Sequence, residues 1–182
     1  MRILGIDPGS SVTGYGVVER RPTGVVHQAH GTLRPPRDQD LAVRLWWIQH
    51  GLAQVIEAHA PDLVVVEQVF VAANPRSALV LGHARGVALA AGAAAGLPVH
   101  EVSAREVKLA VVGNGAAAKA QVQAMVQRLL GLERRPAADA ADALAAAICR
   151  AHQGALAGSR PRKRRGSARS RGRARPVARL PR

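Results

Sequence analysis

Apolar runs and helix-spaced apolar positions alternate along the first 152 residues of the chain. The apolar runs predict five strands, over residues 2–7, 13–19, 25–33, 63–67 and 97–102. Apolar residues at steps of three and four from Leu41 to Ile56 predict a helix over residues 38–59. Further helices are expected over residues 75–96, 104–111, 117–130 and 136–152. This order indicates an α/β fold, a single domain with a five-stranded mixed sheet flanked by helices.

Local signals support several of these boundaries. Pro8-Gly9-Ser10 predicts a turn that joins the first two strands as a hairpin. Pro75 suits the first turn of a helix. Ser103, with Glu106 three residues later, has the pattern of a capping box, which predicts that a helix begins at Ala104.

The positive charge of the chain is concentrated at its C-terminal end. Residues 155–182 hold 11 of the 26 Lys and Arg residues and no acidic residue, whereas the chain as a whole has a net charge of +14. This segment is too polar and too rich in Gly, Pro and Ser to fold alone. We therefore expect a folded domain over residues 1–154 and a disordered Arg-rich tail over residues 155–182. The tail is interpreted as a nonspecific DNA tether with strong salt dependence, or as a solvated extension without function.

The remaining composition indicates a soluble protein. Cys149 is the single cysteine, so no internal disulfide forms, and its Ala/Ile-rich surroundings predict a buried, inert thiol in a reducing cytosol. The chain enters its first strand at Arg2 without a signal-peptide pattern. The most apolar stretch, residues 87–99, is too short to span a bilayer. We expect a cytoplasmic location and no membrane partner.

Four carboxylates stand where a soluble domain normally places apolar residues. Asp7 ends one apolar run, Glu67 ends another, and both Asp139 and Asp142 lie in an Ala-rich helical segment. A buried charge is costly unless it is paired, and a cluster of carboxylates calls for a cation, for which Mg²⁺ is suited by its preference for oxygen ligands. Taken singly, Asp7 can be a turn residue, Glu67 a satisfied strand-end carboxylate and Asp139 an ordinary first-turn helix residue.

Taken together, the four positions predict one site. Strand ends gather at the same edge of an open α/β sheet, and residues three apart share one face of a helix. Two Mg²⁺ ions roughly 4 Å apart could then activate a water molecule and stabilise the leaving oxygen of a phosphodiester. The four carboxylates therefore point to a metal-dependent nuclease.

The motifs around these acids closely resemble the RuvC family of Holliday-junction resolvases over about residues 1–152. The resemblance rests on residues 4–10 (LGIDPGS), 13–16 (TGYG), 67–70 (EQVF), 82–86 (GHARG), 107–115 (VKLAVVGNG) and 138–147 (ADAADALAAA). It implies a ribonuclease-H-like fold and a homodimer that makes paired symmetric nicks in four-way DNA junctions during recombination and repair. It also implies Mg²⁺ or Mn²⁺ as the cofactor and a branch-migration motor complex as a partner.

The resemblance further assigns roles to individual residues. It places catalysis and metal binding on the four carboxylates and puts the helix over residues 75–96 at the dimer interface. It also implies that Phe70 stacks on an unpaired base at the junction centre, although a place in the hydrophobic core is the alternative from the sequence alone. Positions that match basic residues of the family, or are weaker candidates for contacting DNA, are Lys108, Lys119, Arg76 and Arg85.

Three other functions are considered on the same residues. A nuclease acting on RNA or on RNA–DNA hybrids shares the opening Gly5-Ile6-Asp7-Pro8-Gly9 pattern. An actin-like phosphotransferase also opens with such a loop, but it needs two domains around a nucleotide and this chain has room for one. A noncatalytic junction-binding protein is disfavoured because all four acids are present.

Overall fold

The computed structural model describes residues 1–68 and 74–158 of the chain. Its central sheet consists of β1 (Arg2–Asp7), β2 (Thr13–Arg21), β3 (Gly24–Leu33), β4 (Leu63–Gln68) and β5 (Val99–Ser103). The strands lie in the order β3-β2-β1-β4-β5, and β1 pairs antiparallel with β2 and parallel with β4. The predicted five-stranded mixed sheet is therefore confirmed.

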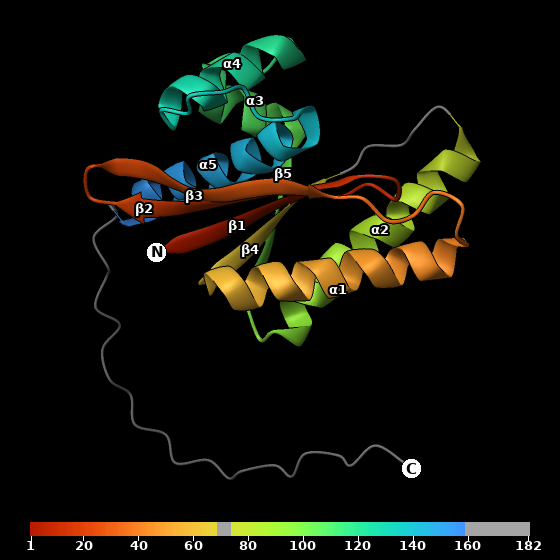
Figure 1. Ribbon diagram of the computed structural model, residues 1–182. Helices are drawn as coiled ribbons and strands as arrows, with labels where there is room; N and C mark the ends of the chain where they lie inside the picture. Colours follow the sequence, from red (N-terminus) through yellow and green to blue (C-terminus); the bar gives the residue numbers. More distant parts are fainter. Residues whose placement is uncertain (69–73, 159–182) are drawn as a thin grey trace, which may run out of the picture.

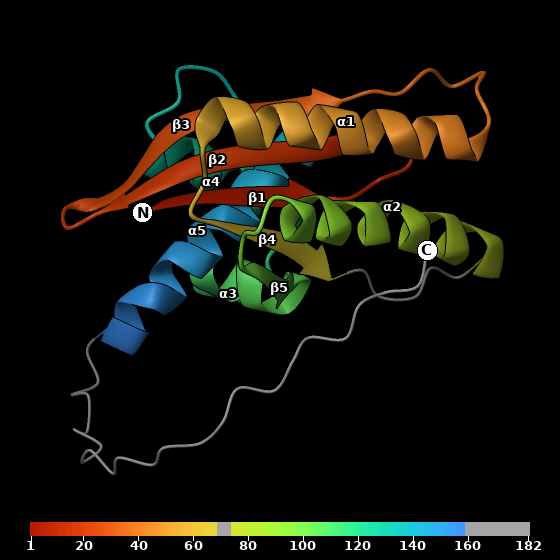
Figure 2. The ribbon, with the colours of Figure 1, turned by 90° about the horizontal axis from the view of Figure 1, so that it is seen from below.

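Helices cover both faces of this sheet. They are α1 (Leu41–His59), α2 (Pro75–Ala94), α3 (Ala104–Val112), α4 (Lys119–Leu129) and α5 (Ala138–Gly158). Figure 1 shows α3, α4 and α5 on one face of the sheet, with α5 directly on the strands, and α1 and α2 on the other face. In Figure 2, viewed from the side of α1 and α2, the two helices lie side by side over the sheet, α1 on the side of β2 and β3 and α2 on the side of β4. The molecule is thus three-layered, with a sheet between two layers of helices.

Alternating side chains of the strands fill two separate cores. Ile3 and Val65 pack with α3, α4 and α5, whereas Leu4 and Val64 pack with α1 and α2. Because both faces of the central strands are covered, these strands read as continuous apolar runs. The same alternation directs position 7 of β1 and position 67 of β4 to the α5 side of the sheet.

The predicted elements all form, with small shifts at their ends. The helix expected from residue 38 begins at Leu41, with Asp40 as its N-cap residue. The last helix, expected to end near residue 152, continues to Gly158, because Ala155, Leu156 and Ala157 favour helix enough to carry it past Gly154. Residues 155–158, expected to belong to the disordered tail, are therefore helical. The capping box of Ser103 and Glu106 is confirmed, since each side chain accepts a hydrogen bond from the other residue's backbone N–H.

Two further expectations concern Cys149 and α2. Cys149 is buried, and burial raises the pKa of its thiol to about 11, as expected of an inert core cysteine. Helix α2 is long and apolar enough to cross a membrane by length and composition, and only 22% of its apolar window is buried. One side of α2 packs on α1 and β4, while its opposite side exposes apolar and small residues, among them Leu79, Gly82 and Gly86.

Candidate active site

Asp7 ends β1, and Glu67 is the penultimate residue of β4, the parallel strand beside it. The register pairs Ile6 of β1 with Val66 of β4, so the two acids follow directly after the last paired positions. Both side chains lie on the α5 face, because Ile3 and Val65, an even number of residues earlier, pack under that helix. Two carboxylates thus stand side by side at the carboxyl edge of the sheet.

Helix α5 brings the second pair of acids to the same edge. Asp139 is in its first turn and Asp142 follows three residues later, so both project from one side of the helix. Each is half-buried, while Ala140, Ala141 and Ala143 between and beside them are fully buried against the sheet. The Ala-rich segment therefore packs closely with its small side chains and leaves the two carboxylates at the rim.

Glycines in β1 and β2 allow this close packing. A Cβ atom on Gly14 would lie 2.0 Å from the carbonyl oxygen of Asp139, and one on Gly5 would lie 2.0 Å from that of Ala143. A Cβ on Gly16 would lie 2.6 Å from the Cγ of Leu144. Real side chains cannot approach so closely, so α5 rests on a strip of strand backbone without side chains. Gly14 is also the partner of Asp7 in the β1–β2 ladder, which fixes the start of α5 over the end of β1.

The four acids interact electrostatically. Burial raises the pKa of Asp7 to about 7, and repulsion from Glu67, Asp142 and Asp139 adds to this effect. Burial, followed by repulsion from Asp142, raises the pKa of Glu67 to about 7. Burial also raises the pKa of Asp142, even though an ion pair opposes the shift. Burial and mutual repulsion therefore make it unfavourable for all these carboxylates to be ionised together.

Lys119 supplies the positive charge closest to the acids. Its Nζ lies 2.5 Å from Oδ2 of Asp142, and its side chain is 60% exposed. Burial lowers the pKa of Lys119, but pairing with Asp142 and attraction to Asp7 and Asp139 raise it on balance. Lys119 begins α4, so the loop and helix after α3 carry a cation over the acidic edge.

A cavity adjoins this ion pair. Its volume is about 210 Å³, and Glu67, Lys108, Lys119 and Asp142 contribute to its lining together with apolar residues of α3 and α4. Two of the basic residues predicted from the sequence, Lys108 and Lys119, therefore lie at the acidic site. The side of the cavity that carries the lysines is suited to an anionic group next to the carboxylates.

The other predicted DNA-contacting residues lie elsewhere or outside the described residues. Phe70 falls in residues 69–73 and so lies outside the described part of the chain. Arg76 is exposed at the start of α2 and lines a cavity of about 290 Å³ with Ser10 and Ser77. Arg85 forms an ion pair with Glu101 of β5, which holds its guanidinium away from the acidic cluster. A DNA-contacting role for any of the three stays a prediction.

The loop after Asp7 is fixed by residues that the sequence analysis missed. The Thr13 hydroxyl, fully buried, donates to the Gly9 carbonyl (2.7 Å) and accepts from its N–H (3.3 Å). Arg44 of α1 donates to the Ser10 carbonyl from Nε (3.1 Å) and from Nη2. A threonine after a Pro-Gly turn is a detectable signal for such a loop clamp, whereas nothing in the helical pattern around Arg44 marks it.

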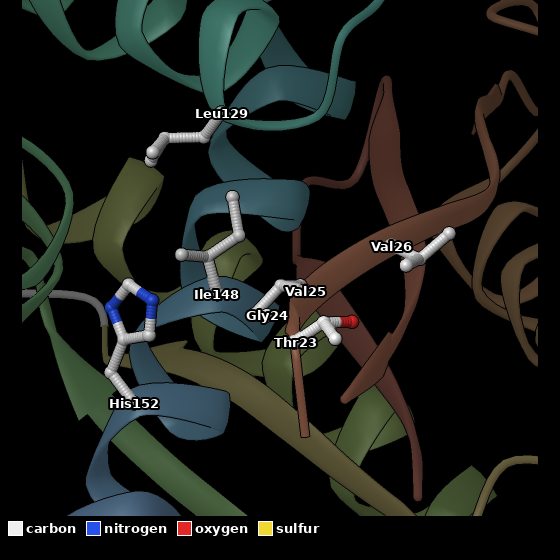
Figure 3. A pocket seen from close by; sticks show the side chains of 7 residues that line it. All are labelled: Thr23, Gly24, Val25, Val26, Leu129, Ile148 and His152. Atoms are coloured by element: carbon white, nitrogen blue, oxygen red, sulfur yellow. The ribbon is translucent and has the colours of Figure 1, made fainter. Parts of the chain in front are cut away.

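A third cavity is remote from the acids. It measures about 280 Å³ and lies between the β2–β3 turn, the end of α4 and the C-terminal half of α5 (Figure 3). Its lining combines polar and apolar groups, with His152 and Ile148 on α5 and Val25 across from them on β3 (Figure 3). None of the predicted site residues contributes to its lining.

The acidic cluster suits a divalent cation by its donor chemistry. Its ligands are all carboxylate oxygens, which hard ions such as Mg²⁺ prefer, and the raised pKa values reflect the cost of ionising these buried, mutually repelling carboxylates. Among residues 1–68 and 74–158, no three Asp, Glu, His or Cys side chains are already gathered tightly enough to hold an ion. The residues fit such an ion in charge and in donor chemistry.

A mixed sheet with carboxylates at the ends of β1 and β4 and in the first turns of α5 defines a nuclease of the ribonuclease-H-like class. Residues 3–150 match the family model described as crossover junction endodeoxyribonuclease RuvC. The chain belongs to this family.

Curated relatives with the same family name align with this chain over most of their length. The crossover junction endodeoxyribonuclease RuvC of Halorhodospira halophila is 57% identical over 152 residues, which cover 83% of this chain and 90% of the relative. The Geobacter sulfurreducens protein of the same name is 51% identical over 156 residues, covering 86% and 95%. Among solved structures, Thermus thermophilus RuvC in complex with its Holliday junction substrate is 31% identical, with a TM-score of 0.81 over 86% of this chain and 96% of that one.

Proposed function

We propose that the protein is a Holliday-junction resolvase, a homodimeric endonuclease that makes paired symmetric nicks in four-way DNA junctions. The observation that carries the proposal is the convergence of carboxylates from β1, β4 and α5 at one edge of the sheet, in a chain that belongs to the RuvC family. The similarity to a RuvC that is bound to a Holliday junction supports this substrate over an RNA or RNA–DNA hybrid.

The four carboxylates are assigned to catalysis and to metal binding. Asp7, Glu67, Asp139 and Asp142 would hold divalent ions, two per subunit, with Mg²⁺ as the natural ion and Mn²⁺ as a substitute. Such ions activate a water molecule and stabilise the leaving oxygen of the phosphodiester. The protein's own contribution is to hold the acids at one edge through the β1–β4 register and the contact of α5 with Gly14.

Basic residues around the cluster are assigned to the DNA backbone. Lys119 and Lys108 line the cavity next to Asp142 and Glu67, where an anionic phosphate would meet both lysines and bring its ester bond to the acids. Phe70, three residues after Glu67, is assigned to stacking on an unpaired base at the junction centre. Arg76 and Arg85 are weaker candidates, Arg85 because it is already paired with Glu101.

The exposed face of α2 supports the homodimer. Residues on this face recur at steps of three and four and include Leu79, Gly82, His83, Gly86 and Ala90. Leu79 is 67% exposed, and Cβ atoms at Gly82 and Gly86 would meet nothing within 4 Å. Two such faces can pack closely across a two-fold axis, and a two-fold dimer matches the symmetry of a four-way junction.

Three assignments extend the proposal beyond the site. The Arg-rich residues 155–182 are assigned to nonspecific DNA tethering. A branch-migration motor complex is assigned as the partner, and the protein is expected to act in the cytoplasm. The first follows from the charge of the segment, and the other two from the family.

Nicking of a labelled four-way junction, with a linear duplex of the same arm sequence and an RNA–DNA hybrid alongside, tests the proposal. We expect paired nicks in the junction alone, dependent on Mg²⁺, and no nicks with Asp7→Asn, which keeps junction binding. Glu57→Gln, which changes an exposed acid on α1, serves as the matched control and should cut normally. Preference for the hybrid, or nicking by Asp7→Asn, would overturn the proposal.

A further inference from the structure

A bulge in β3 brings two histidines onto one face of the sheet. The β2–β3 register passes from Val18–His27 to Val17–Ala29, which leaves Gln28 as an extra residue in the edge strand. Residues three apart normally point to opposite faces of a strand, but the inserted residue cancels that difference. His27 and His30 therefore share a face.

The partners of the two histidines identify this face. His27 is opposite Val18, which belongs to the core under α5, and His30 is opposite Gly16, against which Leu144 of α5 packs. Both imidazoles are half-buried beside that helix, at the outer strand of the sheet. The acidic cluster is instead formed by the carboxyl ends of β1 and β4 with the start of α5, and neither histidine lines the cavity beside it.

The two imidazoles are arranged as a pair of ligands. Nε2 of His27 lies 2.8 Å from Nδ1 of His30, and the ring centroids are 4.9 Å apart with the rings inclined at 59°. Two imidazole nitrogens bound to one Zn²⁺ at about 2.0–2.1 Å are separated by about 2.9–3.4 Å, depending on the coordination angle. A small rotation of either ring would therefore replace the shared hydrogen bond by two bonds to one metal ion.

Partial burial favours the neutral imidazole at His27. Burial, together with repulsion from His30, lowers the pKa of His27, so that its neutral form is favoured near neutral pH. Neutral imidazole is the form that binds metal ions. Among the described residues, no third Asp, Glu, His or Cys joins the pair as a ligand.

We propose that His27 and His30 form a binding site for a borderline transition-metal ion such as Zn²⁺, Ni²⁺ or Cu²⁺, with water completing the coordination. The site differs in chemistry from the acidic cluster, because imidazole selects these ions while carboxylates select Mg²⁺ and Mn²⁺. A bound ion ties residues on both sides of the bulge together and holds the edge strand in its bulged register.

Copper binding to the full-length protein in the presence of excess Mg²⁺ tests the site. Electron paramagnetic resonance should show one Cu²⁺ coordinated by two imidazole nitrogens. His27→Gln and His30→Gln should each reduce affinity at least tenfold and leave one coordinating imidazole. His152→Gln, at an exposed histidine of α5, is the matched control. It should change neither the copper affinity nor the number of coordinating imidazoles.

Two measurements keep the result unambiguous. Circular dichroism of the glutamine variants checks that they fold, because glutamine retains a hydrogen-bonding side chain at each half-buried position. Nicking of the junction in Mg²⁺ should be unchanged in both variants. Copper binding that survives in both variants, or that is lost in His152→Gln or Asp7→Asn instead, would show that the histidine pair is only a hydrogen-bonded structural contact.

Discussion

The carbonyl oxygen of Asp139 occupies the space that a side chain on Gly14 would need. A Cβ atom built on Gly14 lies 2.0 Å from that oxygen and 2.3 Å from the carbonyl carbon. Gly14 is also opposite Asp7 in the β1–β2 ladder. One residue without a side chain therefore sets the distance between the acid at the end of β1 and the acids at the start of α5.

Gly14→Ala should displace the start of α5 and impair the site. The added methyl group meets backbone atoms, which cannot rotate away, so we expect a loss of about 1–3 kcal/mol in the free energy of unfolding. The nicking rate should fall by a larger factor than the fraction of folded protein does, because Asp139 and Asp142 move with the helix. Thermal unfolding and single-turnover nicking measure the two effects. Glu57→Ala, at an exposed position of α1, is the control and should leave the melting temperature unchanged or slightly higher; equal effects of the two substitutions would contradict this account.

The raised pKa values predict a stability cost of the acidic site in the absence of metal. Asp7 and Glu67 have pKa values of about 7 in the folded protein, compared with ordinary values of 3.8 and 4.5. Between about pH 4 and pH 7 the two carboxyl groups lose their protons in the unfolded chain but keep them in the folded protein. The free energy of unfolding therefore falls as the pH rises from about 4 to about 7.

Asp7→Asn removes part of this cost. In EDTA at pH 8, we expect the variant to be more stable than the unmodified protein by on the order of 3 kcal/mol, and the difference should disappear near pH 4. Urea unfolding at both pH values measures it. Addition of Mg²⁺ should stabilise the unmodified protein more than the variant. A variant that is less stable at pH 8 would show that Asp7 carries no uncompensated charge.

Much of the site could be predicted from the sequence because it depends on local patterns. Asp7 and Glu67 end apolar runs, and strand alternation alone places both on one face of the sheet. The contact between Gly14 and Asp139 joins positions 125 residues apart and leaves no periodic signal. The ion pair of Lys119 with Asp142 was also not predicted, because it depends on how α4 packs over α5. The bulge at Gln28 was missed because the run of residues 25–33 reads as an ordinary strand.

Lys119 should act differently on metal binding and on cutting. In the free protein its ammonium group contacts Asp142 and opposes the binding of a cation to the same carboxylate. Lys119→Ala should therefore lower the Mg²⁺ concentration at which the melting temperature is half-shifted. The same variant should nick the junction more slowly, because a positive charge beside the phosphate is lost.

The control for Lys119 lies on the same helix. Arg128→Ala removes a positive charge from the last turn of α4, at the opposite end of that helix from Lys119. It should change neither the Mg²⁺ midpoint nor the nicking rate. A Mg²⁺ midpoint that rises in Lys119→Ala would show that the lysine assists metal binding instead of competing with it.

The exposed face of α2 predicts how the dimer can be broken. Leu79 is 67% exposed in the isolated chain and would be buried in a two-fold interface. Leu79→Arg would then place two like charges close together across the two-fold axis. We expect this variant to be monomeric by light scattering at micromolar concentration, with an unchanged circular dichroism spectrum. Leu109→Arg, at a leucine of α3 that is 58% exposed, is the matched control and should remain dimeric. A monomer that retains its fold should lose the pairing of nicks on a four-way junction, because the two symmetric cuts then require two independent binding events. If Leu79→Arg remains a dimer, α2 does not form the interface.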